Sequence, residues 1–153
     1  IQSEPYNNHR KPLIDIIEKT NHKIAKLDNG KRVSQQEYYQ RTTNSKIILA
    51  PFGYGEMAPR DLEAAMFGSV LIKPDMSYVD TNPNPYIDGE TYIACKHDYS
   101  DLEEKIEDLL GNNEKCHYII ENSRKKFKEL LTPENIALKV YDIFSNMNLV
   151  ITE

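Results

Sequence analysis

The order of apolar and polar positions along the chain predicts a series of strands. Apolar runs at residues 46–50, 70–72 and 92–95 are short and bounded by glycine-containing or polar segments, which is typical of strands. The first two runs are apolar at consecutive positions, as strands buried on both faces of a parallel sheet are. A weaker strand is expected at 22–27, and residues 1–3 fit the tail of another.

Helical periodicity separates these strands and continues to the end of the chain. Helices are expected at 12–17, from 34 onward, and at 60–67, 100–110, 114–131 and 133–147. Ser34 with Glu37, and Ser100 with Glu103, have the spacing of capping boxes. In the helix 60–67 we expect Leu62, Ala65 and Met66 to form the buried face. Gly68 then stands where a left-handed residue closes a helix.

Strand and helix alternate up to about residue 110, so we expect βαβ units with right-handed crossovers. At 153 residues the chain fits one domain with a core of its own. The fold class predicted is therefore α/β: a Rossmann-like parallel sheet with flanking helices, spanning residues 1–153. The last two helices form a C-terminal tail that should pack on the flank of the sheet.

Net charge, hydropathy and cysteine content limit the possible partners and cellular compartment of the protein. The formal net charge of −5 argues against a dedicated nucleic-acid binder, which usually carries a basic stripe. No apolar run approaches the roughly 18 residues that span a bilayer, and no signal peptide opens the chain. Cys95 and Cys116 form no CxxC pair, which favours a reduced, cytoplasmic setting. Because the sequence lacks an initiator Met, we expect it to be either a trimmed chain or a domain excised from a longer protein.

The loop at 51–59 is the first candidate for chemistry, since ligands of open α/β sheets bind beyond the carboxyl ends of the strands. Gly53 and Gly55 allow the backbone to approach a ligand closely. The following helix start offers free N–H groups and a positive dipole end, which suit a diphosphate. Arg60 lies in the first helical turn, where a cation is unfavourable unless an anion is present. Glu63, one turn later, is placed to accept hydrogen bonds from two ribose hydroxyls.

Each of these residues also has an ordinary interpretation. Arg60 and Glu63 have the spacing of a surface ion pair, and the two glycines that of a simple turn. Lys73 ends a strand at the ligand-bearing edge, where it either binds phosphate or is solvated.

The long loop 74–89 carries further polar candidates, and its length suggests a function. Four carboxylates there are candidates for sugar hydroxyls, with a solvated acidic loop as the alternative: Asp75, Asp80, Asp88 and Glu90. Three tyrosines in or beside it either stack on a sugar or base or cover an edge of the core: Tyr78, Tyr86 and Tyr92. The histidines show no metal-binding spacing, and no Asp-x-Asp pair, P-loop or nucleophile elbow occurs.

One segment resembles a known family. Phe52-Gly53-Tyr54-Gly55, followed by the run from Pro59 to Ile72, is similar to the donor-site segment of group 1 glycosyltransferases of the GT-B type. Its Arg-x-x-Glu-Ala variant is most similar to the CgeB-like and exostosin-like branches. The resemblance covers roughly residues 34–147 and is strong only over 47–73.

The resemblance implies a role for each candidate. Glu63 would bind the donor ribose and Arg60 the diphosphate, and these two would carry the catalytic contribution of this half. The other donor-binding candidates are Gly53, Tyr54, Gly55, Glu56 and Lys73. Many members have a second glutamate eight positions before the one matching Glu63; here that position is Gly55, and Glu56 lies one residue later. GT-B enzymes need no metal, so neither metal nor resident cofactor is expected.

The sequence thus predicts a glycosyltransferase donor domain that binds a nucleotide-diphospho-sugar, from a bacterial-type polysaccharide or glycoprotein pathway. Its expected partners are a sugar or glycan acceptor and an N-terminal acceptor-binding domain, with no nucleic acid. Two alternatives stay open. One is a non-catalytic module that binds a nucleotide or sugar phosphate, and the other is a protein-interaction domain with a vestigial pocket.

Overall fold

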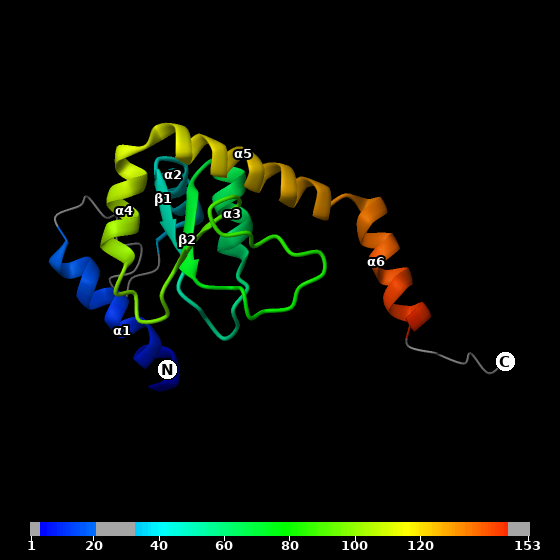
Figure 1. Ribbon diagram of the computed structural model, residues 1–153, viewed down its shortest axis with the longest axis horizontal. Coiled ribbons are helices and arrows are strands. Elements are labelled where there is room, and N and C mark those ends of the chain that lie inside the picture. Colours follow the sequence, from blue (N-terminus) through cyan, green and yellow to red (C-terminus); the bar gives the residue numbers. More distant parts are fainter. Residues whose placement is uncertain (1–3, 21–32, 147–153) are drawn as a thin grey trace.

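The protein is a three-layer α/β domain with a parallel sheet in the middle (Figure 1). The computed structural model describes residues 4–20 and 33–146 of the chain. Within these residues the strands are β1 (Ile47–Leu49), β2 (Val70–Pro74) and β3 (Ile93–Cys95), in the order β1-β2-β3 with both pairings parallel. The Rossmann-like fold class expected from the sequence is confirmed. The strands expected at 1–3 and 22–27 lie outside the described residues.

The alternation of side chains along β2 divides the core between the two faces of the sheet. Val70 and Ile72 point into the larger core, with apolar residues of α1 (Glu4–Lys19), α4 (Leu102–Gly111) and α5 (Asn113–Leu130). Leu71 points the other way, into a smaller core formed with α3 (Pro59–Phe67) and the loop 75–92. All of β2 is buried, as a central strand of a parallel sheet should be.

The connection from β2 to β3 is a long loop, as the sequence predicts for residues 74–89. Residues 75–92, all of them described, hold no helix; they form a loop with one bridge, Asp88 to Tyr92. Met76 and Tyr86 of this loop are buried in the smaller core. The loop therefore fills the place of a crossover helix on that face, because its apolar side chains cover the sheet as a helix would.

Helix boundaries follow the sequence in part. In α2 (Gln35–Thr43) Ser34 is the N-cap, and its hydroxyl accepts from the Glu37 amide, as expected. The capping box expected at Ser100 is wrong: α4 starts after Asp101, whose carboxylate accepts from the Lys96 amide instead. Helix α1 also begins well before Pro12, because that proline removes only one hydrogen bond from a helix whose apolar face is docked on the core.

The buried face expected for α3 is wrong in part. Ala65 is buried as expected, but Met66 is 64% exposed, Leu62 is half-buried, and Asp61 and Ala64 are the other buried residues. Periodicity misplaced the face because Asp61 counts as polar, yet its carboxylate is paired inside the protein. Gly68 does close the helix in the left-handed conformation, at a φ of 79°.

The two C-terminal helices behave differently from each other. Helix α5 packs across α3 and the sheet, as expected, and the Arg124 guanidinium donates to the Ala65 carbonyl. Helix α6 (Pro133–Asn146) runs away from the sheet, which contradicts the expected flank packing (Figure 1). Its apolar side chains, Ile136, Leu138, Val140, Tyr141, Ile143 and Phe144, are exposed. None of the helices in the described residues is both long and apolar enough to cross a membrane.

Candidate functional site

Three loops converge at the carboxyl edge of the sheet, where the sequence places a ligand. The Lys73 ammonium at the end of β2 donates to the Glu56 carbonyl at 2.6 Å, which joins that strand to the loop 51–58. The Tyr78 hydroxyl donates to the Glu56 carboxylate at 3.4 Å and links the loop 75–92 to the same place. His97, just after β3, has its ring 5.7 Å from that of Phe52. The expected convergence of the first two loops is thus observed.

The loop 51–58 is closed on itself and open to solvent. The Gly53 amide donates to the Gly55 carbonyl at 3.1 Å, which makes a tight turn. A Cβ added at Gly55 would meet no atom within 4 Å, and Tyr54 beside it is 94% exposed. No internal contact therefore requires glycine at position 55, and a ligand has room to approach the backbone there.

The first turns of α3 bring Arg60 and Glu63 together with a tyrosine of α2. The Tyr38 hydroxyl donates to the Glu63 carboxylate. Burial and this bond raise the pKa of Tyr38, and the nearby charge of Arg60 acts in the opposite direction. Within the described parts of the chain no ion pair joins Arg60 to Glu63. We name the half-buried set Arg60, Glu63 and Tyr38 the open cluster.

The opposite side of α3 holds a second, buried set: Lys73, Asp61 and Tyr86, here named the closed cluster. Lys73 is 1% exposed, and its ammonium lies 2.5 Å from the Asp61 carboxylate. The same carboxylate oxygen accepts from the Tyr86 hydroxyl at 2.6 Å and from the Ala58 amide at 3.2 Å. Burial lowers the pKa of Lys73, and Asp61 partly offsets this. Lys73 is therefore engaged inside the protein and presents no ammonium group to a phosphate at the surface.

Aromatic side chains form part of the exposed edge. The His97 ring lies 5.6 Å from that of Tyr78, which is 57% exposed. Asp75, close by, accepts from the Ser77 hydroxyl at 2.6 Å and from the Ser77 amide, and these bonds lower the pKa of Asp75. The edge thus combines exposed rings with an ionised carboxylate.

The other residues in or beside the loop 74–89 that the sequence suggested as sugar ligands do not join the converging loops. Two of them make contacts within the protein, and two others are exposed. Tyr92 is buried, and its hydroxyl accepts from the Met76 amide at 3.0 Å. Asp88 accepts from the Ala94 amide at 2.8 Å. Asp80 and Glu90 are exposed. Of the three tyrosines named in or beside the loop 74–89, Tyr78 alone offers an exposed ring, while Tyr86 and Tyr92 are buried.

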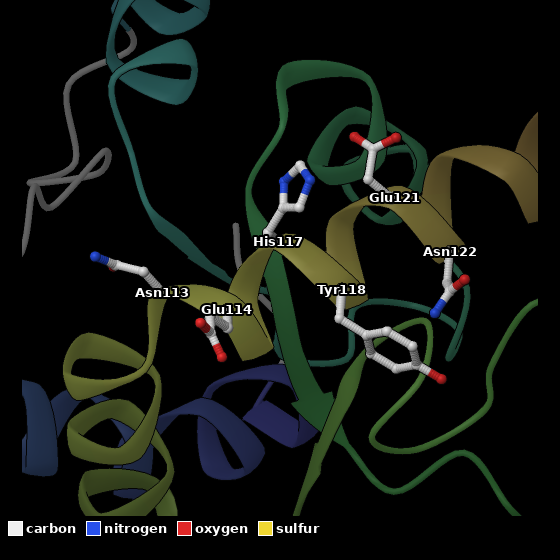
Figure 2. A pocket seen from close by; sticks show the side chains of 6 residues that line it. All are labelled: Asn113, Glu114, His117, Tyr118, Glu121 and Asn122. Carbon is white, nitrogen blue, oxygen red and sulfur yellow. The ribbon is translucent and has the colours of Figure 1, made fainter.

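Two shallow hollows lie on the surface. One, of about 460 Å³, is lined by side chains of α2 and α3 that include Glu63 of the open cluster and the packed rings of Tyr39 and Phe67. The other, of about 530 Å³, is lined by side chains of α5 alone, among them His117, Tyr118 and Glu121 (Figure 2). The start of α5 contacts Lys46, just before β1, so the second hollow is at the amino edge of the sheet, away from the converging loops.

Sequence reasoning missed three residues at or near the site. Tyr38 lies on a helix that precedes the glycine loop, and nothing in its spacing links it to Glu63. Asp61 was missed because hydrophobic periodicity places a charged residue on the exposed face of a helix. His97 follows directly after a strand, at the edge where ligands bind, and that position was the available clue.

The sequence matches no protein-family model and no curated protein. Within residues 4–20 and 33–146, no three His, Cys, Asp or Glu side chains gather closely enough to hold a metal ion. We therefore infer a function from the fold and from the geometry of the carboxyl edge.

Proposed function

We propose that the carboxyl edge binds a nucleotide-diphospho-sugar and that the domain is the donor-binding half of a glycosyltransferase. The observation that carries this proposal is the open cluster at the start of α3, directly after a solvent-open glycine turn. A helix N-terminus with an arginine in its first turn suits a diphosphate. The arginine forms no ion pair with Glu63, which leaves its charge available to a ligand.

Glu63 supplies the second part of the recognition. One oxygen of its carboxylate accepts from the Tyr38 hydroxyl, and this bond orients the group. The other oxygen is directed to the ribose hydroxyls of the donor in this proposal, as the family resemblance implies. In this proposal a carboxylate and a guanidinium one helical turn apart bind the ribose and the phosphates of the same nucleotide.

The proposal includes a partner domain. A GT-B cleft has two walls, and this domain supplies one, so the acceptor and a catalytic base would belong to an N-terminal half. The purified domain is expected to transfer no sugar by itself; robust product formation by it would contradict the half-enzyme proposal. A reduced, cytoplasmic setting is part of the same proposal, and the free thiols of Cys95 and Cys116 agree with it.

Calorimetric titration tests the proposal. Uridine and guanosine diphosphates are titrated against the corresponding nucleosides, with and without EDTA. One of the diphosphates should bind more tightly than its nucleoside, because only the diphosphate contacts Arg60 and the helix start. EDTA should leave the affinity unchanged, since guanidinium and helix dipole replace a metal ion.

Two outcomes would count against the proposal. Absence of binding for a panel of nucleoside diphosphates would remove the nucleotide site. Complete loss of binding in EDTA would instead indicate a metal-dependent site of another type. Lys128→Ala is the matched charge control for Arg60→Ala. It removes a cation from the exposed last turn of α5, away from the proposed site.

A further inference from the structure

The geometry points to a sugar-binding platform at the carboxyl edge, formed by the rings of Tyr78 and His97 with Phe52 beside them. This inference rests on the proposed function and extends it, because it places the sugar of the donor as well as its nucleotide. We name these three residues the aromatic platform.

Exposure separates Tyr78 and His97 from the two tyrosines that lie deeper at the same edge. Tyr86 and Tyr92 are buried, with hydroxyls that bond to Asp61 and to the Met76 amide, so their rings are closed to a ligand. Tyr78 is 57% exposed and His97 is exposed as well. Of these four residues, Tyr78 and His97 present a ring surface on which the apolar C–H face of a pyranose can stack.

The three rings support one another. The His97 ring lies 5.7 Å from Phe52 and 5.6 Å from Tyr78, so it is in contact distance of both. The Tyr78 hydroxyl is also tied to the Glu56 carboxylate. Rings held in place by neighbours lose little conformational freedom when a ligand stacks on them. The platform is therefore prepared before a sugar arrives.

The polar surroundings suit a carbohydrate. The Glu56 and Asp75 carboxylates lie close to Tyr78, and His97 is a close neighbour of Asp75. Carboxylates accept hydrogen bonds from sugar hydroxyls, and aromatic rings bind the C–H face of the sugar. The edge therefore has groups that can bind both the hydroxyls and the C–H face of a pyranose.

The aromatic platform and the proposed donor site lie at the same edge of the sheet. Glu56 belongs to the loop that leads into α3, and its carbonyl is bonded to Lys73, which in turn holds Asp61 next to Arg60. One rigid set of contacts thus connects the platform to the first turn of α3.

The test compares nucleotide-sugars with their nucleotides. UDP-glucose and GDP-mannose are titrated beside UDP and GDP, on wild type and on Tyr78→Ala. The variant should lose about three- to tenfold in affinity for the bound nucleotide-sugar, as expected for one lost aromatic contact, and keep its affinity for the nucleotide within about twofold. Tyr78→Phe, which keeps the ring, should retain most of the wild-type affinity.

Tyr118→Ala is the matched control, since this tyrosine on α5 is 55% exposed and lies at the other edge of the sheet. It should change neither affinity. Equal loss for nucleotide and nucleotide-sugar in Tyr78→Ala would overturn the inference, as would no loss in either.

A second measurement separates this inference from the proposed function. If wild type binds no nucleotide, saturation-transfer NMR with glucose and mannose alone still tests the platform. Transfer to the ring C–H protons that disappears in Tyr78→Ala would support the platform without the nucleotide site. Absence of transfer in wild type would overturn it.

Discussion

Helix α3 carries two clusters of similar composition on opposite sides, and they differ in almost every physical respect. Each has one cation, one carboxylate and one tyrosine hydroxyl bonded to that carboxylate. In the closed cluster, the Lys73 ammonium and the Asp61 carboxylate are 1% and 2% exposed and in direct contact. In the open cluster, the cation and the carboxylate are half-buried and form no ion pair with each other.

The difference indicates separate tasks for the same residue types. A buried ammonium and carboxylate lose their hydration, so they must satisfy each other, and the pair leaves nothing for a ligand. Here the pair joins three segments, since Lys73 also binds the Glu56 carbonyl and Asp61 also binds Tyr86. A half-buried pair keeps contact with water, and a ligand can replace that water. We therefore propose that the closed cluster positions the loop and that the open cluster binds the ligand.

The largest expected effect is on the closed cluster. Asp61→Ala leaves the Lys73 ammonium buried without its counter-ion and should lower the free energy of unfolding by about 3–5 kcal/mol. Asp108→Ala is the matched control, because the Asp108–Lys115 pair is largely exposed and should contribute about 1 kcal/mol or less. Urea unfolding measures both. Similar small losses in the two variants would contradict the structural role given to Asp61.

The next effect belongs to the open cluster and concerns affinity. Arg60→Ala should weaken binding of the nucleoside diphosphate by about 1.5–3 kcal/mol, the range for hydrogen bonds to a charged group, with little effect on the free nucleoside. Glu63→Ala should weaken both ligands, because each contains the ribose. Calorimetry on the two variants checks this. A loss of stability of a few tenths of a kcal/mol with unchanged affinities would instead fit ordinary surface residues.

Alkaline pH should distinguish the two tyrosines. Burial, followed by the bond to Asp61, raises the pKa of Tyr86 well above 10.0, so the folded state keeps a proton that the unfolded state loses. This stability is complete below about pH 10 and is lost as the pH rises toward the folded pKa. In Tyr86→Phe the decline above pH 10 should be shallower by about 1.4 kcal/mol per pH unit.

Tyr38→Phe is the comparison for that experiment. Tyr38 is only half-buried, so its substitution should alter the alkaline decline less than Tyr86→Phe does. Urea unfolding at pH values from 9 to 11 gives both slopes. Equal slopes in the two variants would remove the electrostatic distinction between the clusters.

The smallest effect tests how Glu63 is held. Tyr38→Phe removes the hydroxyl that orients the Glu63 carboxylate, and affinity for diphosphate and nucleoside alike should fall by about 0.5–1.5 kcal/mol. Tyr39→Phe serves as the control at the neighbouring position of α2. A gain in affinity for Tyr38→Phe would mean that its hydroxyl competes with the ribose for Glu63.

The fold was largely predictable because its strands have unusual local sequences. Residues 47–49 and 70–72 are apolar at consecutive positions, which is typical of parallel strands; β2 is buried throughout, while Ile47 and Leu49 of the edge strand β1 are half-buried. Gly68 likewise marked the end of α3 because a left-handed residue was needed there. The loop 75–92 was correctly taken as irregular, but its burial of Met76 and Tyr86 was not foreseen.

The location of the candidate site could be predicted from the sequence, but the contacts of its charged side chains could not. The edge of the sheet and the helix start follow from local sequence, whereas the partners of each charged group depend on segments far apart in the chain. Asp61 and Lys73 are twelve positions apart, and Tyr38 and Glu63 are 25 apart. Lys73 therefore had two interpretations from the sequence, and its internal ion pair fits neither the phosphate ligand nor the solvated lysine.

The most direct test of a nucleotide site at the carboxyl edge is an NMR titration of the isotopically labelled protein with a nucleoside diphosphate. The backbone amides of Gly53, Gly55 and Arg60 should show the first and largest shift changes, because the proposed site places the phosphates against the glycine turn and the first turn of α3. Amides of residues 113–122, beside the hollow on α5, should stay unchanged. Shift changes confined to residues 113–122, with none in the loop 51–58, would contradict the site proposed.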